Sequence, residues 1–593
     1  MISMFCALAD FRDLFSNLFH NKKITSVFNI IADIWLLKFL PGMKIKHLLL
    51  AALATAPIIT LAQKAKTPAA STTLPRPKLV VGIVVDQMRW DYLYRYNDRY
   101  QAGGFKRMLN EGFTCENTHI DYLPTETGPG HSCIYTGSVP AIHGIAANSF
   151  IIQATGKPMY CAEDTTVQGV GSTSVAGKMS PRNLQASTIT DELRLATNFR
   201  SKVVGIALKD RGSILPAGHT PNGAYWFDDV TGNWITSTYY TNDLPAWVKQ
   251  FNDKKLPASY LTKTWETLYP INTYKQSTAD NTPYEGAYRG ETSPVFPHNF
   301  QAIKGADFAA IRSNPLGNTF TLDFAKAALD AEQLGKGDQT DFLAVSLSST
   351  DYVGHQFGPN SIEAEDTYLR LDRDLAGFFT YLDAKVGKGN YTVFLSADHG
   401  AAHNPQFLKD NKIPGGLWDA YAATTELNSI LEKEVNVKRA ILTIDNYEVN
   451  LNNIAIANAK ADVEKIKEIS MAFLRKQTGV MYVVDMQKAQ TASIPGDLRE
   501  RIINGYNAER SGAIQVILKP GYFAGRGKTG TSHGVSSPYD THIPLVFMGW
   551  GIQHGSLNRD THMTDISATI AALLHIQMPS GCIGKVIPEV IKK

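Results

Sequence analysis

The sequence predicts an α/β protein with a doubly wound, mostly parallel central sheet that is sandwiched by helices and carries cap insertions. Short continuous apolar runs recur along the chain, which is typical of strands buried on both faces of a parallel sheet. Between two of these runs, apolar residues recur at helical spacing and complete a strand–helix–strand unit. Polar residues that can bind a metal ion follow most of the runs, and such sheets bind ligands at the carboxyl ends of their strands.

A secretory signal peptide is predicted at residues 43–62. Lys44 and Lys46 supply its basic start, an apolar run follows, and Thr60-Leu61-Ala62 is a passable cleavage site. We therefore expect a periplasmic or secreted protein with no membrane segment after cleavage. Residues 1–42 resemble no targeting class, and we interpret them as a misassigned extension upstream of the true start.

Residues 63–77 are rich in Pro, Ala, Thr and Ser and are predicted to form a flexible leader before the main domain at 78–590. Five apolar runs of that domain are expected to be strands of the central sheet: Leu79–Val85, Lys202–Leu208, Phe342–Leu347, Thr392–Leu395 and Ile543–Met548. The helical pattern Glu363–Leu382 lies between the third and fourth runs.

Two long regions do not follow the strand–helix alternation. Residues from about 150 to 335 are rich in Tyr, Trp, Asn and Pro and, apart from the strand at 202–208, look loop-rich. Residues from about 404 to 530 contain strands and a helix of their own. We interpret both regions as insertions that form a cap over the carboxyl edge of the sheet.

The charge balance gives no reason to expect a nucleic-acid or membrane-surface partner. Residues 1–62 hold six of the 58 basic and three of the 55 acidic residues, so the remainder carries 52 of each and has no formal net charge. No heptad array indicates an assembly, and a monomer is expected. Four cysteines remain after residue 62, which could form disulfides in any of three pairings or stay free and buried: Cys115, Cys133, Cys161 and Cys582.

Several expected strand ends carry aspartate and histidine. Mixed Asp and His ligands suit Zn²⁺ or another borderline divalent ion, and three of each would serve two ions. Taken alone, each of these residues is more simply a helix cap or part of a turn, but together they indicate a metal centre. The candidates are Asp86, Asp351, His355, Asp398, His399 and, in a later loop, His533.

Thr127 precedes a Gly-Pro-Gly turn, and residues from His131 to Tyr135 could then start a helix. A hydroxyl at a strand-to-helix turn lies at the positive end of the helix dipole, where an anion would also bind. The local pattern favours a helix cap for Thr127, because capping is the usual role of threonine there. The predicted metal ligands at the strand ends instead favour Thr127 as a seventh metal ligand and as a nucleophile.

With these residues, the chain resembles the alkaline phosphatase superfamily. Within it, the chain is most similar to the monomeric, phosphate-irrepressible periplasmic alkaline phosphatases of bacteria, which are related to the nucleotide pyrophosphatase/phosphodiesterases. The matching stretches occur in the expected order: VVDQMRWDYL, TETGPGHSCIYTGSVPAIHGIAAN, LKDRGSILPAGH, SSTDYVGHQFGP, LSADHGAAHNP and TSHGVSSPYDTHIPLVFMGWGI. They run from about residue 78 to 590, so the resemblance is global.

The resemblance implies two zinc ions. One would be held by Asp351, His355 and His533, and the other by Asp86, Asp398, His399 and the Thr127 oxygen. Thr127 would be the nucleophile and would form a phospho-threonine intermediate. Phosphoryl oxygens would be contacted by Asn148, although the motif around it departs slightly from the family pattern, and from the cap side by Lys209 and Arg211.

A pair of zinc ions can clamp the attacking and leaving oxygens of an in-line displacement. A guanidinium such as that of Arg211 can bind two phosphoryl oxygens, and an ammonium such as that of Lys209 adds a point charge. Because a monoester has three non-bridging oxygens, such donors favour monoesters over diesters. The expected function is therefore phosphate-scavenging hydrolysis of a broad range of small phosphate monoesters.

Three alternatives are weighed. A phosphodiesterase or nucleotide pyrophosphatase could use the same zinc ions and Thr127, but a diester needs room where Lys209 and Arg211 are expected. A sulfatase needs a Cys or Ser that is oxidised, which Thr127 cannot replace. An exported binding protein without turnover would be expected to lack a ligand. Other histidines are not assigned as metal ligands. His131 and His143 are interpreted as supporting or turn-packing residues, His403 lies near the site in sequence but has no partner there, and His219 and His542 are left undecided.

Overall fold

A computed structural model describes residues 74–302 and 308–592. The predicted upstream extension, the signal peptide and all of the leader up to residue 73 lie outside the described residues. The chain divides into two units, residues 1–75 and residues 76–593, and the second contains the central sheet. Among the helices described, none combines the length and apolar character that crossing a bilayer requires.

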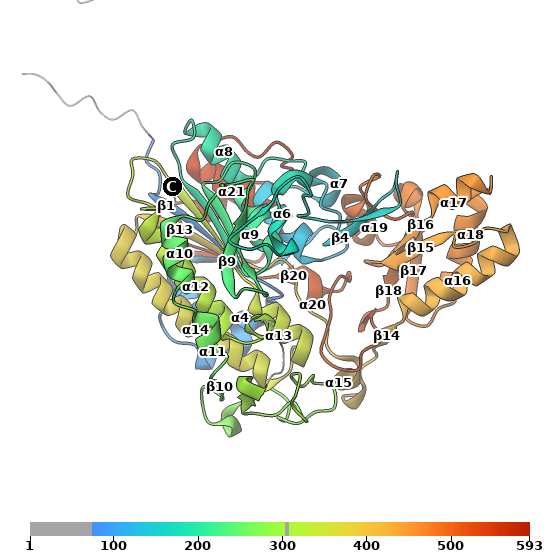
Figure 1. Ribbon diagram of the computed structural model, residues 1–593, viewed down its shortest axis with the longest axis horizontal. Coiled ribbons are helices and arrows are strands. Elements are labelled where there is room, and N and C mark those ends of the chain that lie inside the picture. Colours follow the sequence, from blue (N-terminus) through green and yellow to red (C-terminus); the bar gives the residue numbers. More distant parts are fainter. Residues whose placement is uncertain (1–73, 303–307, 593) are drawn as a thin grey trace, which may run out of the picture. The chain divides into compact units, whose positions relative to one another are not determined.

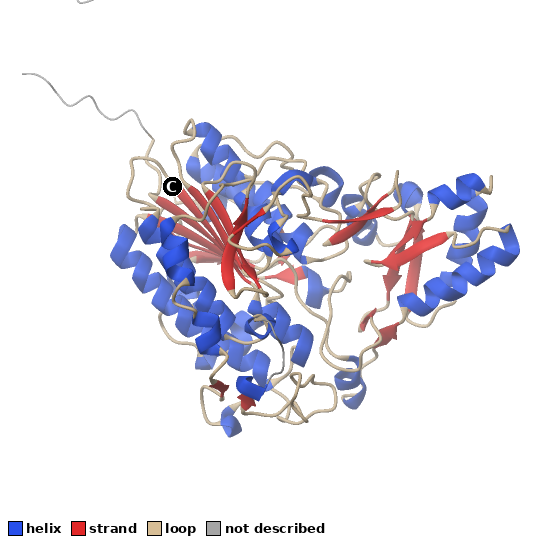
Figure 2. Ribbon diagram, viewed as in Figure 1, coloured by secondary structure: helices blue, strands red, loops and turns tan. Residues whose placement is uncertain are grey.

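A ten-stranded sheet organises this unit (Figures 1 and 2). Its centre is parallel: β1 (Leu79–Val85) pairs with β12 (Asp341–Leu347) on one side and β13 (Tyr391–Ser396) on the other. Beyond β12, the parallel arrangement continues through β7 (Val203–Ala207) and β8 (Gly223–Asp228). The sheet also contains β22 (Gly555–Leu557), β2 (Phe113–Cys115), β21 (Leu545–Gly549), β9 (Asn233–Ser237) and β6 (Gly169–Val170), and its full order is β22-β2-β21-β13-β1-β12-β7-β8-β9-β6. The prediction of a doubly wound α/β sheet is confirmed.

The central strands are buried along their whole length because helices cover both faces (Figure 1). One face is covered by α12 (Leu316–Ala331) and α14 (Ile362–Leu382), the other by α6 (Thr127–Thr136) and α9 (Asp210–Ala217). Gly82 of β1 makes this packing close, since a Cβ there would lie 2.3 Å from the Tyr135 hydroxyl of α6.

Four of the five predicted central strands occur in the parallel part of the sheet, with ends shifted by at most one residue. The fifth prediction is wrong in its direction and length. Pro544 separates β20 (His542–Ile543), which belongs to a three-stranded sheet, from β21 (Leu545–Gly549), which runs antiparallel to β13. Because of that direction, β21 ends at the edge opposite the site and supplies it with no residue.

The expectation that residues 150–335 form a loop-rich cap insertion is also wrong in part. Besides β7, the region supplies β8 and β9 (Asn233–Ser237) to the central sheet and α12 to one of its faces. Aromatic side chains that suggested loops from composition are buried there, with Trp226 and Trp234 at most 1% exposed. Large aromatic residues fit a pleated buried surface, so they mark strands here.

Residues 404–530 contain a separate four-stranded sheet of order β15-β16-β18-β17, with its own apolar core. Its strands are Ile441–Asp445, Glu448–Leu451, Ile514–Leu518 and Val480–Asp485 in that order. Helices α16 (Ala420–Val435) and α18 (Val463–Leu474) pack on it (Figure 1). All four described cysteines are free, as in the second of the two predicted possibilities.

Candidate active site

Thr127 is the first residue of α6 and lies at the carboxyl edge of the central sheet. The helix begins four residues earlier than the sequence indicated, and Thr127 caps nothing, because Glu126 holds the cap position without a side-chain bond. Thr127 is buried, and the backbone N–H groups of the first helical turn have no partner within the helix. Gly130 lets the helix approach β13, since a Cβ there would lie 2.5 Å from the Asp398 carbonyl.

The first group of candidate metal ligands is Asp86, Asp398 and His399. Asp86 follows β1, and the other two follow the neighbouring strand β13. Their ligand atoms lie within 4.8 Å of one another, and His399 Nε2 is 3.8 Å from Asp86 Oδ1. Burial and the nearby carboxylate of Asp398 raise the pKa of Asp86 well above its usual value. Three fully buried groups that include two carboxylates therefore share one small space.

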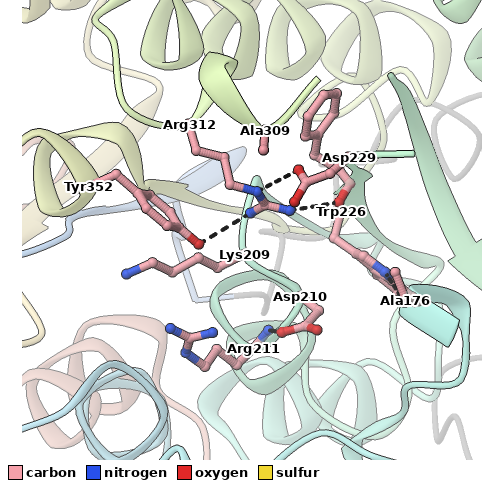
Figure 3. Close-up of a pocket in the computed structure, with 10 residues that line it drawn as sticks. Ala176, Lys209, Asp210, Arg211, Trp226, Asp229, Ala309, Arg312 and Tyr352 are labelled. Carbon is pink, nitrogen blue, oxygen red and sulfur yellow. Dashed lines mark hydrogen bonds and ion pairs between the residues drawn. The ribbon is translucent and has the colours of Figure 1, made fainter. Parts of the chain in front are cut away.

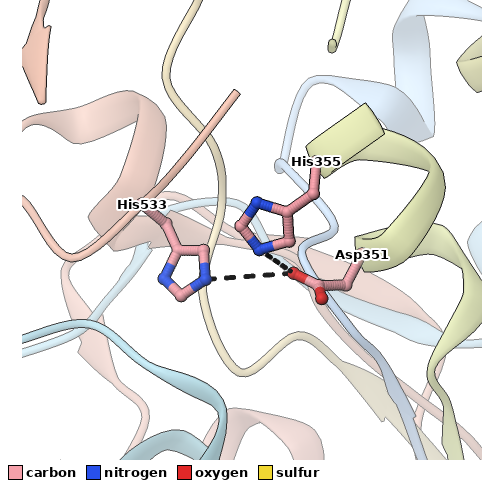
Figure 4. Close-up of side chains that lie close together, drawn as sticks. All are labelled: Asp351, His355 and His533. Atoms are coloured by element: carbon pink, nitrogen blue, oxygen red, sulfur yellow. Dashed lines mark ion pairs between the residues drawn. The ribbon is translucent and has the colours of Figure 1, made fainter. Parts of the chain in front are cut away.

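The second group is Asp351, His355 and His533 (Figure 4). Asp351 and His355 stand four residues apart on α13 (Ser349–Phe357), which follows β12, and His533 comes from the loop before α20 (Pro538–Thr541). Asp351 Oδ1 lies 3.2 Å from His355 Nε2 and 3.9 Å from His533 Nε2. Burial would raise the pKa of Asp351, but His355 and Lys209 lower it well below its usual value.

Backbone carbonyls fix the ring of each histidine in the same way. The Nδ1 atoms of His355, His399 and His533 lie 2.9, 3.0 and 2.7 Å from the carbonyl oxygens of Thr531, Gly400 and Thr125. A carbonyl can only accept, so Nδ1 carries the proton and the Nε2 lone pair faces the site. Such outer contacts are typical of metal-ligating histidines.

The residues present fit divalent metal ions. Within the described part of the chain, Asp86 Oδ1 and His399 Nε2 are buried and make no hydrogen bond. Buried polar atoms without partners are costly, and a bound cation would satisfy both. Burial lowers the pKa of His533 far below its usual value, so its imidazole is neutral and available as a ligand.

Lys209 lies between the two groups of ligands. Its Nζ is 2.8 Å from Asp86 Oδ2, 2.6 Å from Asp351 Oδ2 and 3.3 Å from Thr127 Oγ1. The ring of Tyr352 lies over the ammonium at 5.0 Å from its centroid. The resemblance had implied that Lys209 and Arg211 approach the site from the cap side. Instead, Lys209 follows the central strand β7, and Arg211 lies in the first turn of α9, the helix that comes next.

Asn148 is held beside Thr127 by two hydrogen bonds, one to each of the residues that flank Thr127 in the sequence. Its backbone N–H donates to Glu126 Oε2 at 2.7 Å, and its side-chain Oδ1 accepts from the Gly128 N–H at 2.8 Å. The residues on either side of Thr127 are therefore tied to Asn148. With the amide oxygen bound to backbone, the amide N–H₂ group is the part of Asn148 that remains for a ligand.

A cavity of about 360 Å³ adjoins Lys209 and Arg211 (Figure 3). Arg211 Nη1 donates to the Tyr160 hydroxyl at 3.0 Å, while its Nε makes no hydrogen bond within the described residues. Arg312 donates to Asp229 at 2.6 Å and approaches the Tyr352 hydroxyl at 3.5 Å. The cavity is lined by Ala176, Lys209, Asp210, Arg211, Trp226, Phe227, Asp229, Ala309, Arg312 and Tyr352.

The other histidines singled out in the sequence belong to neither group in the described part of the chain. His131 supports the site: its Nδ1 is 3.3 Å from Asp398 Oδ2, and its Nε2 is 2.8 Å from Ser346 Oγ. His143 is buried and its Nδ1 accepts from the Ile145 N–H at 3.1 Å, while His403 contacts Arg89 and Asn360. His219 pairs with Asp191, and His542 stacks on Trp90. The sequence analysis missed Gln87, Glu126 and Tyr352, which also lie at the site. Each is the sequence neighbour of a predicted site residue, and that position next to Asp86, Thr127 or Asp351 was the signal that could have indicated them.

Comparison with known proteins places this arrangement in a family. The profile of the type I phosphodiesterase/nucleotide pyrophosphatase family matches residues 80–542. The chain belongs to this family. Two relatives are alkaline phosphatases: PhoV of Synechococcus elongatus is 55% identical and the match covers 88% of this chain and 94% of PhoV, and PafA of Elizabethkingia meningoseptica is 54% identical over 88% of this chain and 96% of PafA. A third relative, a Myroides odoratus protein named calcium-transporting ATPase, is 57% identical over 88% of this chain and 96% of the relative.

The crystal structure of wild-type PafA is also similar to this member of the family. It is 54% identical in sequence, has a TM-score of 0.86, and covers 88% of this chain and 100% of the PafA chain. A second structure, of a PafA variant in which one threonine, one asparagine, one lysine and one arginine are substituted, has the same TM-score of 0.86. The resemblance to the alkaline phosphatase superfamily is confirmed.

Proposed function

We propose that the protein is an alkaline phosphatase that hydrolyses phosphate monoesters. The observation that carries the proposal is the convergence of Thr127, Lys209 and two Asp/His groups at the carboxyl edge of one sheet. A buried hydroxyl that faces cations and the start of a helix is suited to attack an anionic phosphoryl group. The alkaline phosphatases PhoV and PafA, similar along 88% of the chain, support the same activity.

The two groups of ligands are assigned to two Zn²⁺ ions, one held by Asp351, His355 and His533 and the other by Asp86, Asp398, His399 and Thr127. The mixed oxygen and nitrogen donors and the aligned Nε2 atoms support zinc. When bound, the ions would neutralise phosphoryl charge and lower the pKa of coordinated hydroxyl groups.

Thr127 is assigned as the nucleophile. Its Oγ would give its proton to solvent and form a bond to phosphorus as the bond from phosphorus to the ester oxygen breaks, and the alcohol would leave with a proton from solvent. Attack of water on the resulting phospho-threonine would release phosphate and restore the hydroxyl. The position of Thr127 at the first turn of α6 supports this role, because the helix dipole favours the transferring anion.

Three side chains are assigned to the phosphoryl oxygens. Asn148 presents its amide N–H₂ group, Lys209 its ammonium, and Arg211 a guanidinium whose Nε has no partner among the described residues. The substituted PafA variant supports these assignments, since the four residue types changed in it are those of Thr127, Asn148, Lys209 and Arg211. Donors for every non-bridging oxygen favour a monoester over a diester.

Paired substrates test the proposal. Zinc-loaded protein should hydrolyse p-nitrophenyl phosphate much faster than bis-p-nitrophenyl phosphate. The opposite preference would move the assignment to a phosphodiesterase, the alternative that the family name suggests. ATP belongs in the same comparison, because the name of the Myroides relative denotes an ATPase. No turnover of any of these would favour an exported binding protein.

Export, a phosphate-scavenging role and a monomeric state are further parts of the proposal. Export rests on the predicted signal peptide at residues 43–62, the scavenging role on export together with the proposed monoester hydrolysis, and the monomeric state on a sequence in which no heptad array indicates an assembly. Intact mass of the protein recovered outside the cytoplasm tests the first. A mature chain that retains any residue before Met43 would contradict both the signal peptide and the assigned start.

A further inference from the structure

Gln87 follows the candidate ligand Asp86 at the end of β1 and is only 3% exposed. Its backbone has a φ of 64°, in the left-handed region that side chains other than Gly, Asn and Asp adopt rarely. A buried residue keeps such a conformation where contacts with its surroundings stabilise it, and such residues cluster at functional sites.

Gln87 contacts one carboxylate from each of the two ligand groups. Its backbone N–H donates to Asp398 Oδ1 at 3.1 Å, and its side-chain Nε2 donates to Asp351 Oδ1 at 2.6 Å. The left-handed backbone makes both bonds available at once, since it turns the N–H toward β13 while the side chain runs toward α13. Asp398 Oδ1 also accepts from the His399 N–H at 3.0 Å, which leaves Oδ2 for a ligand.

We propose that Gln87 is a positioning residue that ties the two metal sites together, with its side-chain amide orienting Asp351 and its backbone N–H orienting Asp398. This inference rests on the proposed function, because it assumes that both groups bind an ion. Outer contacts that orient metal-ligating carboxylates commonly change metal affinity by about 10- to 100-fold.

Gly354 of α13 provides independent support. A Cβ at this position would lie 2.0 Å from Gln87 Oε1 and 3.0 Å from its Cδ, and the three nearest atoms that it would meet all belong to Gln87. The helix that carries Asp351 and His355 therefore leaves a space that the Gln87 amide fills. Glycine in a helix interior costs up to about 1 kcal/mol relative to alanine, so the space is maintained against helix propensity.

Gln87→Gly removes the amide without straining the backbone, because glycine readily adopts a φ of 64°. The backbone bond to Asp398 remains, and only the bond to Asp351 is lost. Zinc titration of metal-stripped protein by calorimetry, with a competing chelator, should show one of two dissociation constants raised about 10- to 100-fold and the other nearly unchanged. Gln87→Asn keeps an amide but is too short by one methylene, and it should give the same result.

Gly354→Ala tests the same contact from the other side. The added methyl group should displace the Gln87 amide and weaken the same zinc site, although alanine favours the helix. In the double variant Gln87→Gly with Gly354→Ala the clash is absent, so its zinc affinity should be no lower than that of Gln87→Gly alone. Such non-additivity is expected of residues that are in contact, whereas distant and independent sites add.

Gln333→Gly is a matched control, because Gln333 also has a positive φ of 53° but lies after α12, and among the described residues its side chain bonds only to the Asp330 carbonyl. It should leave both zinc constants unchanged. Circular dichroism of every variant checks folding. Wild-type protein that binds fewer than two ions would contradict the proposed function together with this inference. Two ions bound by the wild type with unchanged constants in the Gln87 and Gly354 variants would overturn the role of Gln87 alone.

Discussion

The ammonium of Lys209 lies 2.6 Å from a carboxylate oxygen of Asp351. The same ammonium is 2.8 Å from Asp86, so one buried cation serves one carboxylate of each ligand group. These carboxylates raise the pKa of Lys209, against the effect of its burial. In the protein without metal, Lys209 therefore compensates negative charge from both ligand groups, and His355 adds to this at Asp351.

The substitution Lys209→Met should destabilise the metal-stripped protein far more than the zinc-loaded protein. Without zinc, removal of the ammonium leaves buried carboxylates uncompensated, which costs about 3–5 kcal/mol. Bound zinc would compensate Asp86 and Asp351 itself, so the loss should shrink after loading. Urea unfolding of both forms of both proteins measures the difference.

Lys467→Met provides the control for this experiment. Lys467 is also buried and lies 2.8 Å from Asp485, but it belongs to α18, in the part of the chain that holds the separate sheet. Its loss should destabilise the stripped and loaded proteins equally. A Lys209 variant with the same loss in both forms would show that zinc does not replace its charge.

Thr127→Ala should reduce hydrolysis of p-nitrophenyl phosphate by more than about 1,000-fold, because the proposed nucleophile is absent. Zinc should still bind, since six other ligands remain in the two groups. Ser132→Ala is a suitable control: Ser132 has a buried hydroxyl in the same helix that bonds to the Gly128 carbonyl. Comparable activity of the two variants would exclude Thr127 as the nucleophile.

The sequence allowed the ligand groups to be predicted because parallel strands place their carboxyl ends at one edge. Asp86, Asp351 and Asp398 follow three adjacent strands, so their proximity was implied once those strands were recognised as neighbours. The i, i+4 spacing of Asp351 and His355 on α13 similarly fixed their shared face.

Other features depend on tertiary contacts that no local pattern encodes. The antiparallel direction of β21 follows from its pairing with β13 and β2, which a single apolar run cannot reveal. The strands β8 and β9 were hidden by a Tyr- and Trp-rich composition that also suits loops. Gln87 joins residues 264 and 311 positions away along the chain, so its contacts appear only in the folded structure.

Replacing Lys209 and Arg211 together by Ala should harm monoester hydrolysis far more than diester hydrolysis. The two cations are assigned to non-bridging oxygens, and a diester has one fewer of these and less charge. The ratio of kcat/KM for p-nitrophenyl phosphate to that for bis-p-nitrophenyl phosphate should fall by at least about 10-fold, the value of one such contact.

Arg312→Ala is the comparison for that pair, because Arg312 lines the same cavity while donating to Asp229 and to backbone carbonyls. Its loss should affect stability and leave the ratio of the two substrates within about twofold, since it is not assigned to the phosphoryl group. Equal losses of both activities in the Lys209 and Arg211 variant would refute their assignment to monoester recognition.

His298, away from the site, should make stability depend on alkaline pH. It is fully buried, 3.1 Å from Glu363 and 3.2 Å from Glu291. Burial opposes protonation, but these two carboxylates raise the pKa of His298 to about 9. Because this exceeds the unfolded value of about 6.5, the stabilisation is complete below pH 6.5 and is lost as pH rises through 9.

The wild type should therefore lose its advantage over His298→Gln between pH 7 and 9.5, by roughly 2–3 kcal/mol in the free energy of unfolding. Burial and Glu363 also raise the pKa of Glu285 to about 9. Because Glu285 is present in both proteins, its own contribution to the pH dependence is subtracted when the two free energies of unfolding are compared. His143→Gln is the control. Burial lowers the pKa of His143 to about 3, so this histidine is neutral throughout the range and its variant should show a constant difference. A constant difference for His298→Gln as well would show that His298 is not charged in the folded protein.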